Sequence, residues 1–138
     1  MTKEEIINLA HFIKEKFSTR NAIHISKQLG IELRLMHLKP NIYPAYTSHV
    51  GRIPIINLNE KYTLKSQMVL CAHELGHALM HGDKLINEFN DNHNGNYEYE
   101  ANLFAVALLF NQDDLRYEIS KMDNYILKGL LDKNIHLK

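Results

Sequence analysis

The chain has 138 residues, among them 16 basic and 16 acidic side chains and one cysteine. A chain of this length buries enough surface to fold without disulfides, so we expect one domain spanning residues 1–138. The absence of net charge and of a basic stripe argues against a nucleic-acid partner, and no apolar run approaches the roughly 18 residues of a membrane span, which favours a cytoplasmic protein.

The first part of the chain is predicted to be helical. After an acidic start, apolar residues recur at helical spacing: Ile6, Leu9, Ala10, Ile13 and Phe17. This amphipathic pattern is not that of a signal peptide. Residues 21–31 resemble the first helix and turn of a helix-turn-helix, but residues 31–35 alternate apolar and charged side chains. That alternation predicts a strand where a recognition helix would stand, so DNA binding is the less favoured alternative.

Three short strands are expected before residue 60. Besides residues 31–35, they cover residues 46–50 and 53–58. We expect a mostly antiparallel sheet. Pro54 cannot donate to a ladder, which marks its strand as an edge or as irregular at its start. A free edge would allow an extended peptide to add as a further strand, whereas in the alternative interpretation the strands only cover the core.

Residues 64–81 predict a helix of five turns, with Gly82 and Asp83 at its C-terminal cap. Helical spacing places one group of residues on the side predicted to face the core: Leu64, Met68, Cys71, Leu75, Ala78 and Leu79. His73 and His77 point the opposite way. The lone Cys71 is therefore predicted to be a buried small hydrophobe and not a nucleophile or redox group.

The pentapeptide H-E-L-G-H, residues 73–77, predicts a metal site. Residues four apart on a helix lie one above the other, so His73 and His77 can both reach one zinc ion at about 2.0–2.1 Å. Glu74 lies beside the ion and is predicted to be the general base, which accepts a proton from water that the ion activates. This combination is typical of zinc hydrolases.

Residues 97–110 form the second strong helical pattern. Glu98 and Asn102 share one face of it, above the small Ala105. Glu98 would complete a His2Glu set and leave the fourth position for water, as in catalytic zinc sites. Asn102 would accept a hydrogen bond from a ligand histidine and so fix its ring orientation. Glu100, on the other side of this helix, is the alternative ligand.

Some further residues are alternatives for the site. His81 continues the four-residue spacing but lies about 12 Å from His73 along the helix, too far to share one ion, and we predict that the helix dipole favours it there. Asp83 is another alternative ligand, because some zinc peptidases take their third ligand six residues after the second histidine. The candidates for stabilising the oxyanion are His49, His93, Tyr43, Tyr46, Tyr97 and Tyr99.

Two segments quoted above carry a resemblance. The run H-E-L-G-H-A-L-M-H at 73–81, the run E-Y-E-A-N-L-F-A at 98–105 and the leucines at 108–109 resemble the ImmA/IrrE family of bacterial and phage metallopeptidases. The resemblance spans most of the chain. One departure is Asn111, which stands where the family usually has a proline and affects only the end of that helix.

The resemblance implies zinc on His73, His77 and Glu98, with Glu74 as the general base. It also implies a protein substrate, namely a transcriptional repressor of a phage or mobile element that carries a helix-turn-helix domain. Cleavage of such a repressor would relieve repression.

The predicted fold is a zincin-like α+β domain, in which a small sheet packs on the histidine helix. The polar residues 87–96 predict a loop, and residues 112–121 and 124–132 predict two short packing helices. The predicted function is that of a zinc endopeptidase. The alternative from another class is a non-catalytic zinc-binding protein that binds a repressor or regulator without cutting it, and hydrolysis of a small amide is a third interpretation. A fourth protein ligand would favour the non-catalytic protein, whereas the presence of Glu74 argues against it.

Overall fold

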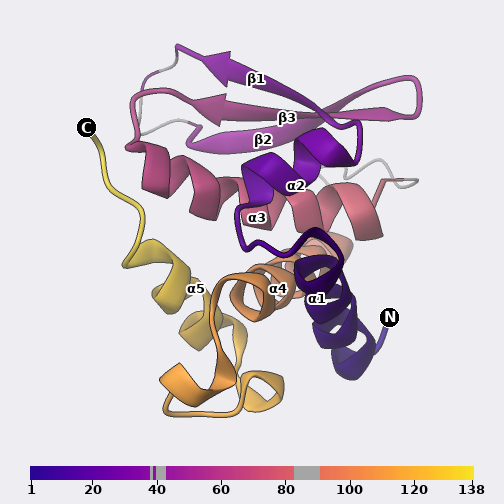
Figure 1. Ribbon diagram of the computed structural model, residues 1–138, viewed down its shortest axis with the longest axis vertical. Helices are drawn as coiled ribbons and strands as arrows, with labels where there is room; N and C mark the ends of the chain where they lie inside the picture. The colour runs from indigo at the N-terminus through magenta and orange to yellow at the C-terminus, as the bar shows by residue number, and fades with distance from the viewer. Residues whose placement is uncertain (38, 40–42, 83–90) are drawn as a thin grey trace.

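The computed structural model describes residues 1–37, 39, 43–82 and 91–138, and of residues 91–95 it describes the backbone only. This part of the chain forms five α-helices, a three-stranded sheet and two single-turn 3₁₀ helices, an α+β architecture (Figure 1). In chain order the elements are α1 (Lys3–Phe17), α2 (Ala22–Gln28), β1 (Glu32–Met36), β2 (Ala45–Val50), β3 (Ile53–Asn59), α3 (Leu64–Met80), α4 (Asp91–Leu109), η1 (Gln112–Asp114), η2 (Ile119–Lys121) and α5 (Asn124–Asp132). No helix within the described ranges is both long and apolar enough to span a bilayer.

Side-chain caps set where the helices begin. Thr2 and Glu5 form a capping box at α1, in which each side chain accepts a hydrogen bond from the other residue's backbone N–H. Asn21 caps α2 and Thr63 caps α3, in each case by accepting from backbone N–H groups of the first turn. Asp123 does the same for α5. These short polar residues therefore fix the starts of α1, α2, α3 and α5.

The sheet is mixed, and the prediction of a mostly antiparallel sheet was wrong. The strand order is β1-β3-β2, with β1 parallel and β2 antiparallel to the central β3. The tight turn at Gly51 joins β2 and β3 as a hairpin, whereas β1 reaches β3 from the other side. Alternation of apolar residues reports burial of one face but not the direction of the neighbouring strand. The finer assignment to a zincin-like fold stays a prediction.

Pro54 does not mark an edge strand, because it lies in the central β3. Backbone N–H groups along β3 alternate in direction: that of Asn59 donates to Pro44 on the β2 side, and that of Glu60 donates to Met36 on the β1 side. The nitrogen of Pro54 therefore faces β1, whose pairing begins only one residue later, at Ile55. The second alternative of the prediction, an irregular start, describes this position, and β2 is the edge strand beside α3.

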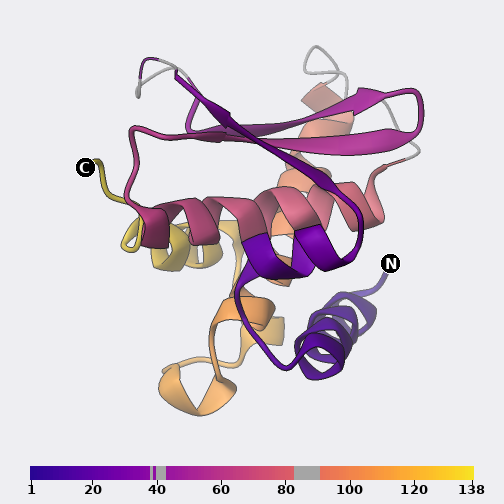
Figure 2. The ribbon, with the colours of Figure 1, turned by 45° about the horizontal axis from the view of Figure 1, so that its top comes forward.

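Helix α3 lies between the sheet and the other large helices (Figures 1 and 2). The sheet covers one side of α3, α2 packs along it, and α4 packs against its other side, while α1 and α5 pack on α4. Within α4, every residue from 101 to 108 is buried, so this helix forms the centre of the core. Helix α3 is apolar on most sides, and α4 covers one side of it while the sheet covers the other.

The predicted core face of α3 was correct only in part. Cys71 and Leu75 are fully buried, and burial raises the pKa of the Cys71 thiol to about 12, which suits its predicted apolar role. Leu64 and Leu79, at the two ends of the helix, are 66% and 37% exposed. Helical periodicity places these leucines on the core face, but the layers above and below cover only the middle turns.

Two predictions about the connecting segments were also wrong. Residues 91–96, part of the predicted loop, belong to α4, because Asn and Asp are favoured at helix starts as well as in loops. Residues 87–90 and Asp83 lie outside the described residues. Residues 112–121 form two separate 3₁₀ turns and not one helix. The Gln112 side chain holds this bend, since it donates to the carbonyl of Tyr117 and accepts from the N–H of Ile119.

A glycine permits the close contact between α3 and α4. A Cβ at Gly76 would lie 3.2 Å from Cδ1 of Phe104 and 3.3 Å from Cα of Ala101, both on α4. The second of these atoms is backbone, which cannot move aside as a flexible side chain can. Gly76 and the small Ala101 therefore set the distance between the helix that carries the histidines and the helix that carries Glu98.

We expect Gly76→Val to lower the free energy of unfolding by about 1–3 kcal/mol, because overpacking forces the two helices apart. Gly129→Ala is the matched control: Gly129 also lies inside a helix, but a Cβ there has no neighbour within 4 Å. That variant should gain about 0.5–1 kcal/mol from helix propensity. Urea unfolding measures both values, and a Gly76→Val protein as stable as the wild type would contradict this packing.

Candidate metal centre

Two helices bring three donor groups together. His73 and His77 lie one turn apart on α3, and their Nε2 atoms are 3.2 Å apart. Glu98, from α4, places Oε1 at 2.8 Å from Nε2 of His77 and Oε2 at 3.2 Å from Nε2 of His73. Among the residues whose side chains are described, these three form the group of His, Cys, Asp or Glu that could hold a metal ion. They are the three ligands expected from the sequence.

Hydrogen bonds to the Nδ1 atoms of His73 and His77 fix the orientation of the two rings. The amide nitrogen of Asn102 donates to Oδ1 of Asn124 at 2.8 Å, so its oxygen is free to accept from Nδ1–H of His73, also at 2.8 Å. Nδ1 of His77 meets Nδ1 of His81 at 2.9 Å. In a neutral imidazole only one nitrogen carries hydrogen. With Nδ1 as the donor, Nε2 of His73 presents a lone pair towards Glu98.

The charges around the group respond to this convergence. Burial alone lowers the pKa of His73, but hydrogen bonding to Glu98 and the negative charge of Glu74 raise it above its ordinary value. Burial alone raises the pKa of Glu98, but the contacts with His73 and His77, which donate to it and carry positive charge when protonated, hold it well below its usual range. The raised pKa of His73 and the lowered pKa of Glu98 have one cause, because the groups that converge here favour a positive charge among them.

The donor set fits a zinc ion. Two imidazole nitrogens and a carboxylate are ligands that zinc takes in catalytic sites. Tetrahedral zinc with bonds of about 2.0–2.1 Å needs donors about 3.3 Å apart. The separations here are 3.2, 3.2 and 2.8 Å, so movements of a few tenths of an ångström would satisfy such an ion. The same donors also suit other divalent transition metals.

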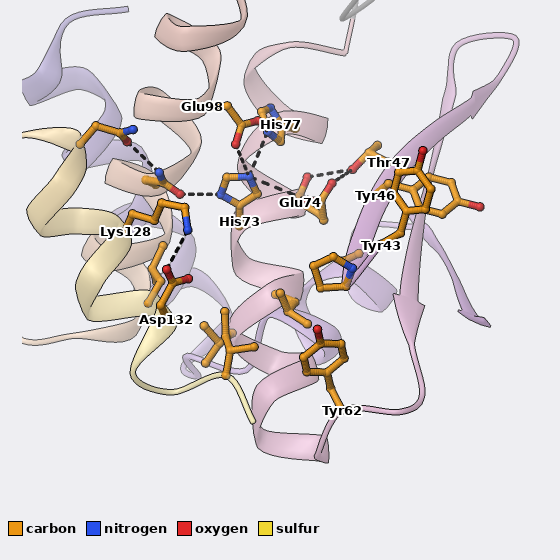
Figure 3. A pocket seen from close by; sticks show the side chains of 18 residues that line it. Tyr43, Tyr46, Thr47, Tyr62, His73, Glu74, His77, Glu98, Lys128 and Asp132 are labelled. Carbon is orange, nitrogen blue, oxygen red and sulfur yellow. Dashed lines mark hydrogen bonds and ion pairs between the residues drawn. The ribbon is translucent and has the colours of Figure 1, made fainter. Parts of the chain in front are cut away.

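Glu74 lies at the side of the three donors. Its side chain is only 10% exposed, and Oε2 is 3.9 Å from Nε2 of His73. The hydroxyl of Thr47, on the edge strand β2, donates to Oε1 of Glu74 at 2.9 Å. Figure 3 shows the carboxylate held between Thr47 and His73 and facing the pocket. A hydroxyl from the sheet thus fixes the orientation of the predicted base.

A cleft of about 740 Å³ opens beside these groups (Figure 3). One wall comes from residues 43–47 before and within β2, the floor from α3, and the other wall from α5 and Ile135. The segment after α5 is attached to the start of α3, since the N–H of His136 donates to Oγ of Ser66 at 2.7 Å. Its apolar lining lies mainly towards the start of α3: Pro44, Tyr62, Val69, Leu70, Leu131 and Ile135.

The structure separates the alternative residues. Glu100 is not part of the three-donor group, because its Oε1 lies 2.9 Å from Nε2 of His81. The prediction that His81 is only an end residue of its helix missed this contact. Of the six candidates for the oxyanion, Tyr43 and Tyr46 line the cleft. Tyr97 stacks on His81 with ring centroids 4.3 Å apart, and the side chain of His93 lies outside the described residues.

Sequence reasoning missed Thr47, Asn124, and the pairing of His81 with Glu100. Nothing in the local pattern around Thr47 or Asn124 relates them to a helix that is far away in the chain. For His81 a signal existed: a third histidine at four-residue spacing behind the pair, together with a second glutamate near Glu98. With three histidines facing two glutamates, one glutamate can meet the first two histidines and the other glutamate the third.

An α+β protein with two helix-borne histidines, a glutamate between them, a carboxylate from the next helix and a cleft alongside has the arrangement of a metal-dependent hydrolase. The particular family follows from comparison with known proteins. The chain belongs to the Peptidase_M78 family, whose IrrE N-terminal-like domain matches residues 26–135. This match confirms the resemblance to ImmA/IrrE peptidases and places the chain among metallopeptidases. No curated protein and no solved structure gave a significant match.

We expect Glu98→Ala to weaken zinc binding by more than about 100-fold, because one of the three metal-binding groups is removed. Loss of a residue that only hydrogen-bonds to a ligand costs less than this. Elemental analysis after gel filtration should find one zinc per wild-type chain and little in the variant. Glu118→Ala, which removes an exposed carboxylate paired with Lys121, is the control and should keep zinc. Tight stoichiometric zinc in Glu98→Ala would place the third ligand elsewhere.

Proposed function

We propose that this chain is a zinc-dependent endopeptidase, with zinc on His73, His77 and Glu98 and with Glu74 as the general base. The observation that carries the proposal is the convergence of two imidazole nitrogens and a carboxylate beside a second, separately held carboxylate. Zinc bound there would supply Lewis-acid polarisation of a peptide carbonyl and would lower the pKa of water. Membership of a peptidase family supports the same reaction class.

Glu74 is suited to proton transfer by its position. Its carboxylate faces the cleft, next to the donors but outside their hydrogen-bonded group. One oxygen accepts from Thr47, so the other can take a proton from the attacking water and pass it to the leaving nitrogen. Burial on α3 keeps the carboxylate in one place, which lowers the cost of orienting it for each turnover.

The edge of β2 suits an extended peptide. The backbone groups of Tyr46 and Ser48 point towards β3, so those of the alternating residues Ala45 and Thr47 face the outer edge of the sheet. This edge runs along the cleft that holds His73 and Glu74. We propose that a substrate segment adds there as a strand, held through its backbone, and that the apolar half of the cleft receives one of its side chains.

A protein substrate is part of the proposal. The family resemblance favours a transcriptional repressor with a helix-turn-helix domain, carried by a phage or mobile element. Cleavage of that repressor would relieve repression. The first substrates to test are therefore helix-turn-helix proteins encoded beside the gene for this chain.

The alternative is a zinc-binding protein that binds such a regulator without cutting it. A site closed by a fourth protein ligand would favour it. Within the side chains that the structure describes, the candidate group has three members and opens on a cleft. This favours the peptidase, because an open position and a nearby base serve hydrolysis and have no evident use in simple binding.

We expect Glu74→Gln to keep one zinc per chain and to lose cleavage, because the amide cannot accept the proton although it preserves size and shape. The measurement pairs zinc content with mass-spectrometric detection of repressor fragments, with the wild type assayed alongside. Undiminished cleavage by Glu74→Gln would disprove the role of this residue. Zinc in both proteins with the repressor bound but intact would favour the non-catalytic alternative.

Thr47→Val should keep zinc but slow cleavage about tenfold, because a hydrogen bond to a charged group is worth about 1.5–3 kcal/mol and only part of it bears on the base. Thr47→Ser retains the hydroxyl and should restore the rate. Single-turnover cleavage with enzyme in excess measures this effect without the contribution of product release. Equal rates for the valine and serine variants would show that Thr47 does not orient Glu74.

A further inference from the structure

Behind His77, on the side away from the cleft, lie a buried histidine and a carboxylate. We propose that His81 and Glu100 form a positioning pair that orients His77 and strengthens it as a metal ligand. The inference rests on the proposed metal centre and assigns a role to two residues outside it. Neither residue would contact the metal or the substrate.

The geometry is a continuous chain of three side chains. Nδ1 of His77 lies 2.9 Å from Nδ1 of His81, and Nε2 of His81 lies 2.9 Å from Oε1 of Glu100. The His81 side chain is 2% exposed and that of Glu100 is 22% exposed. Tyr97 stacks on the His81 ring at 4.3 Å between centroids. The His81 ring is therefore held on one face by packing and at both nitrogens by polar partners.

The carboxylate sets the direction of both hydrogen bonds. An ionised Glu100 can only accept, so Nε2–H of His81 donates to it. In a His81 ring that carries this single hydrogen, Nδ1 is an acceptor, and Nδ1–H of His77 donates to it. Nε2 of His77 is left as a lone pair aimed at Glu98 and His73. The Glu100 carboxylate, acting through His81, thus fixes the tautomer that His77 needs for metal binding.

His73 and His77 are supported differently. Behind His73 stand two neutral amides, Asn102 and Asn124, whereas the chain behind His77 ends in a carboxylate. A hydrogen bond that ends on an anion is shorter and roughly twice as strong as one between neutral groups. It also makes the ligating nitrogen more basic. His77 is therefore the ligand whose donor strength the protein sets through charge.

A role in capping α3 does not explain the His81 side chain. The backbone N–H of His81 donates to the carbonyl of His77 at 2.8 Å, a bond that any residue except proline would make. The imidazole itself turns towards Glu100 and His77. Any residue of similar size could fill this space, so the observed hydrogen bonds are the feature that needs a function.

Zinc affinity measured by chelator competition tests the proposal. We expect His81→Phe, which fills the space but offers no acceptor, to bind zinc about 10–100-fold more weakly than the wild type. Glu100→Gln keeps a hydrogen-bond acceptor without the charge and should bind about fivefold more weakly. The matched control is Glu60→Gln, which alters an exposed glutamate paired with His37, away from the cleft, and should leave zinc affinity unchanged.

Two further readouts separate positioning from a purely structural role. Thermal unfolding of each metal-free variant should show a folded protein whose stabilisation by added zinc is smaller than in the wild type. Long-range ¹H–¹⁵N NMR of the zinc-loaded wild type should find hydrogen on Nε2 of His81 and on Nδ1 of His77. Hydrogen on Nδ1 of His81 would overturn the proposal.

The other outcomes are also decisive. Wild-type affinity in a folded His81→Phe would overturn the positioning pair while leaving the peptidase proposal intact. If His81→Phe does not fold, unchanged affinity in Glu100→Gln overturns it instead. A wild-type chain that binds no zinc would refute the proposed function itself, and the two failures are therefore distinguishable.

Discussion

The site depends on one electrostatic constraint: three hydrogen-bond acceptors point at the same place. Asn102 takes the hydrogen of His73 on one side, and His81 takes that of His77 on the other. The lone pairs that remain on both rings converge on Glu98. Such an arrangement is costly unless a positive charge sits among the acceptors, and hydrogen bonding to Glu98 accordingly raises the pKa of His73 despite its burial. A metal ion would bind the lone pairs of all three groups at once.

The packing of α3 on α4 turns this constraint into a property of two helices. Gly76 lets the helices approach until a Cβ at this position would crowd Phe104 and the backbone of Ala101, and this closeness brings the glutamates of α4 to the histidines of α3. Glu98, Glu100 and Asn102 then each meet a different part of the histidine row. Helix α4 therefore supplies the candidate ligand Glu98 and also the residues that support the two histidines of α3. A shift of α4 would disturb all of these contacts together.

Helical periodicity made much of this accessible from the sequence. The spacing of His73 and His77 predicted a shared ion, and the spacing of Glu98 and Asn102 predicted one face towards it, since neighbours within a helix follow from sequence separation alone. Contacts between distant elements did not follow. The parallel pairing of β1 and the hydroxyl of Thr47 beside Glu74 depend on how layers stack, which residue patterns do not encode. The pairing of His81 with Glu100 had a signal in the sequence, the third histidine and the second glutamate, but which groups meet depends on how α4 packs on α3. For the same reason the ends of α3 were predicted to be buried although Leu64 and Leu79 lie beyond the layers that cover it.

The surroundings of Glu98 and Glu74, rather than their residue type, support the different roles that we propose for them. Glu98 is half exposed, but two imidazoles hold its oxygens and keep its pKa low, which makes it a fixed donor and a poor proton acceptor. Glu74 is nearly buried, and a neutral hydroxyl holds it near the same histidine. Thr47 takes only one of its oxygens, so the other is left facing the cleft beside the three donors. The division between ligand and base that we propose for this site therefore rests on the partners that α4 and β2 bring to each carboxylate.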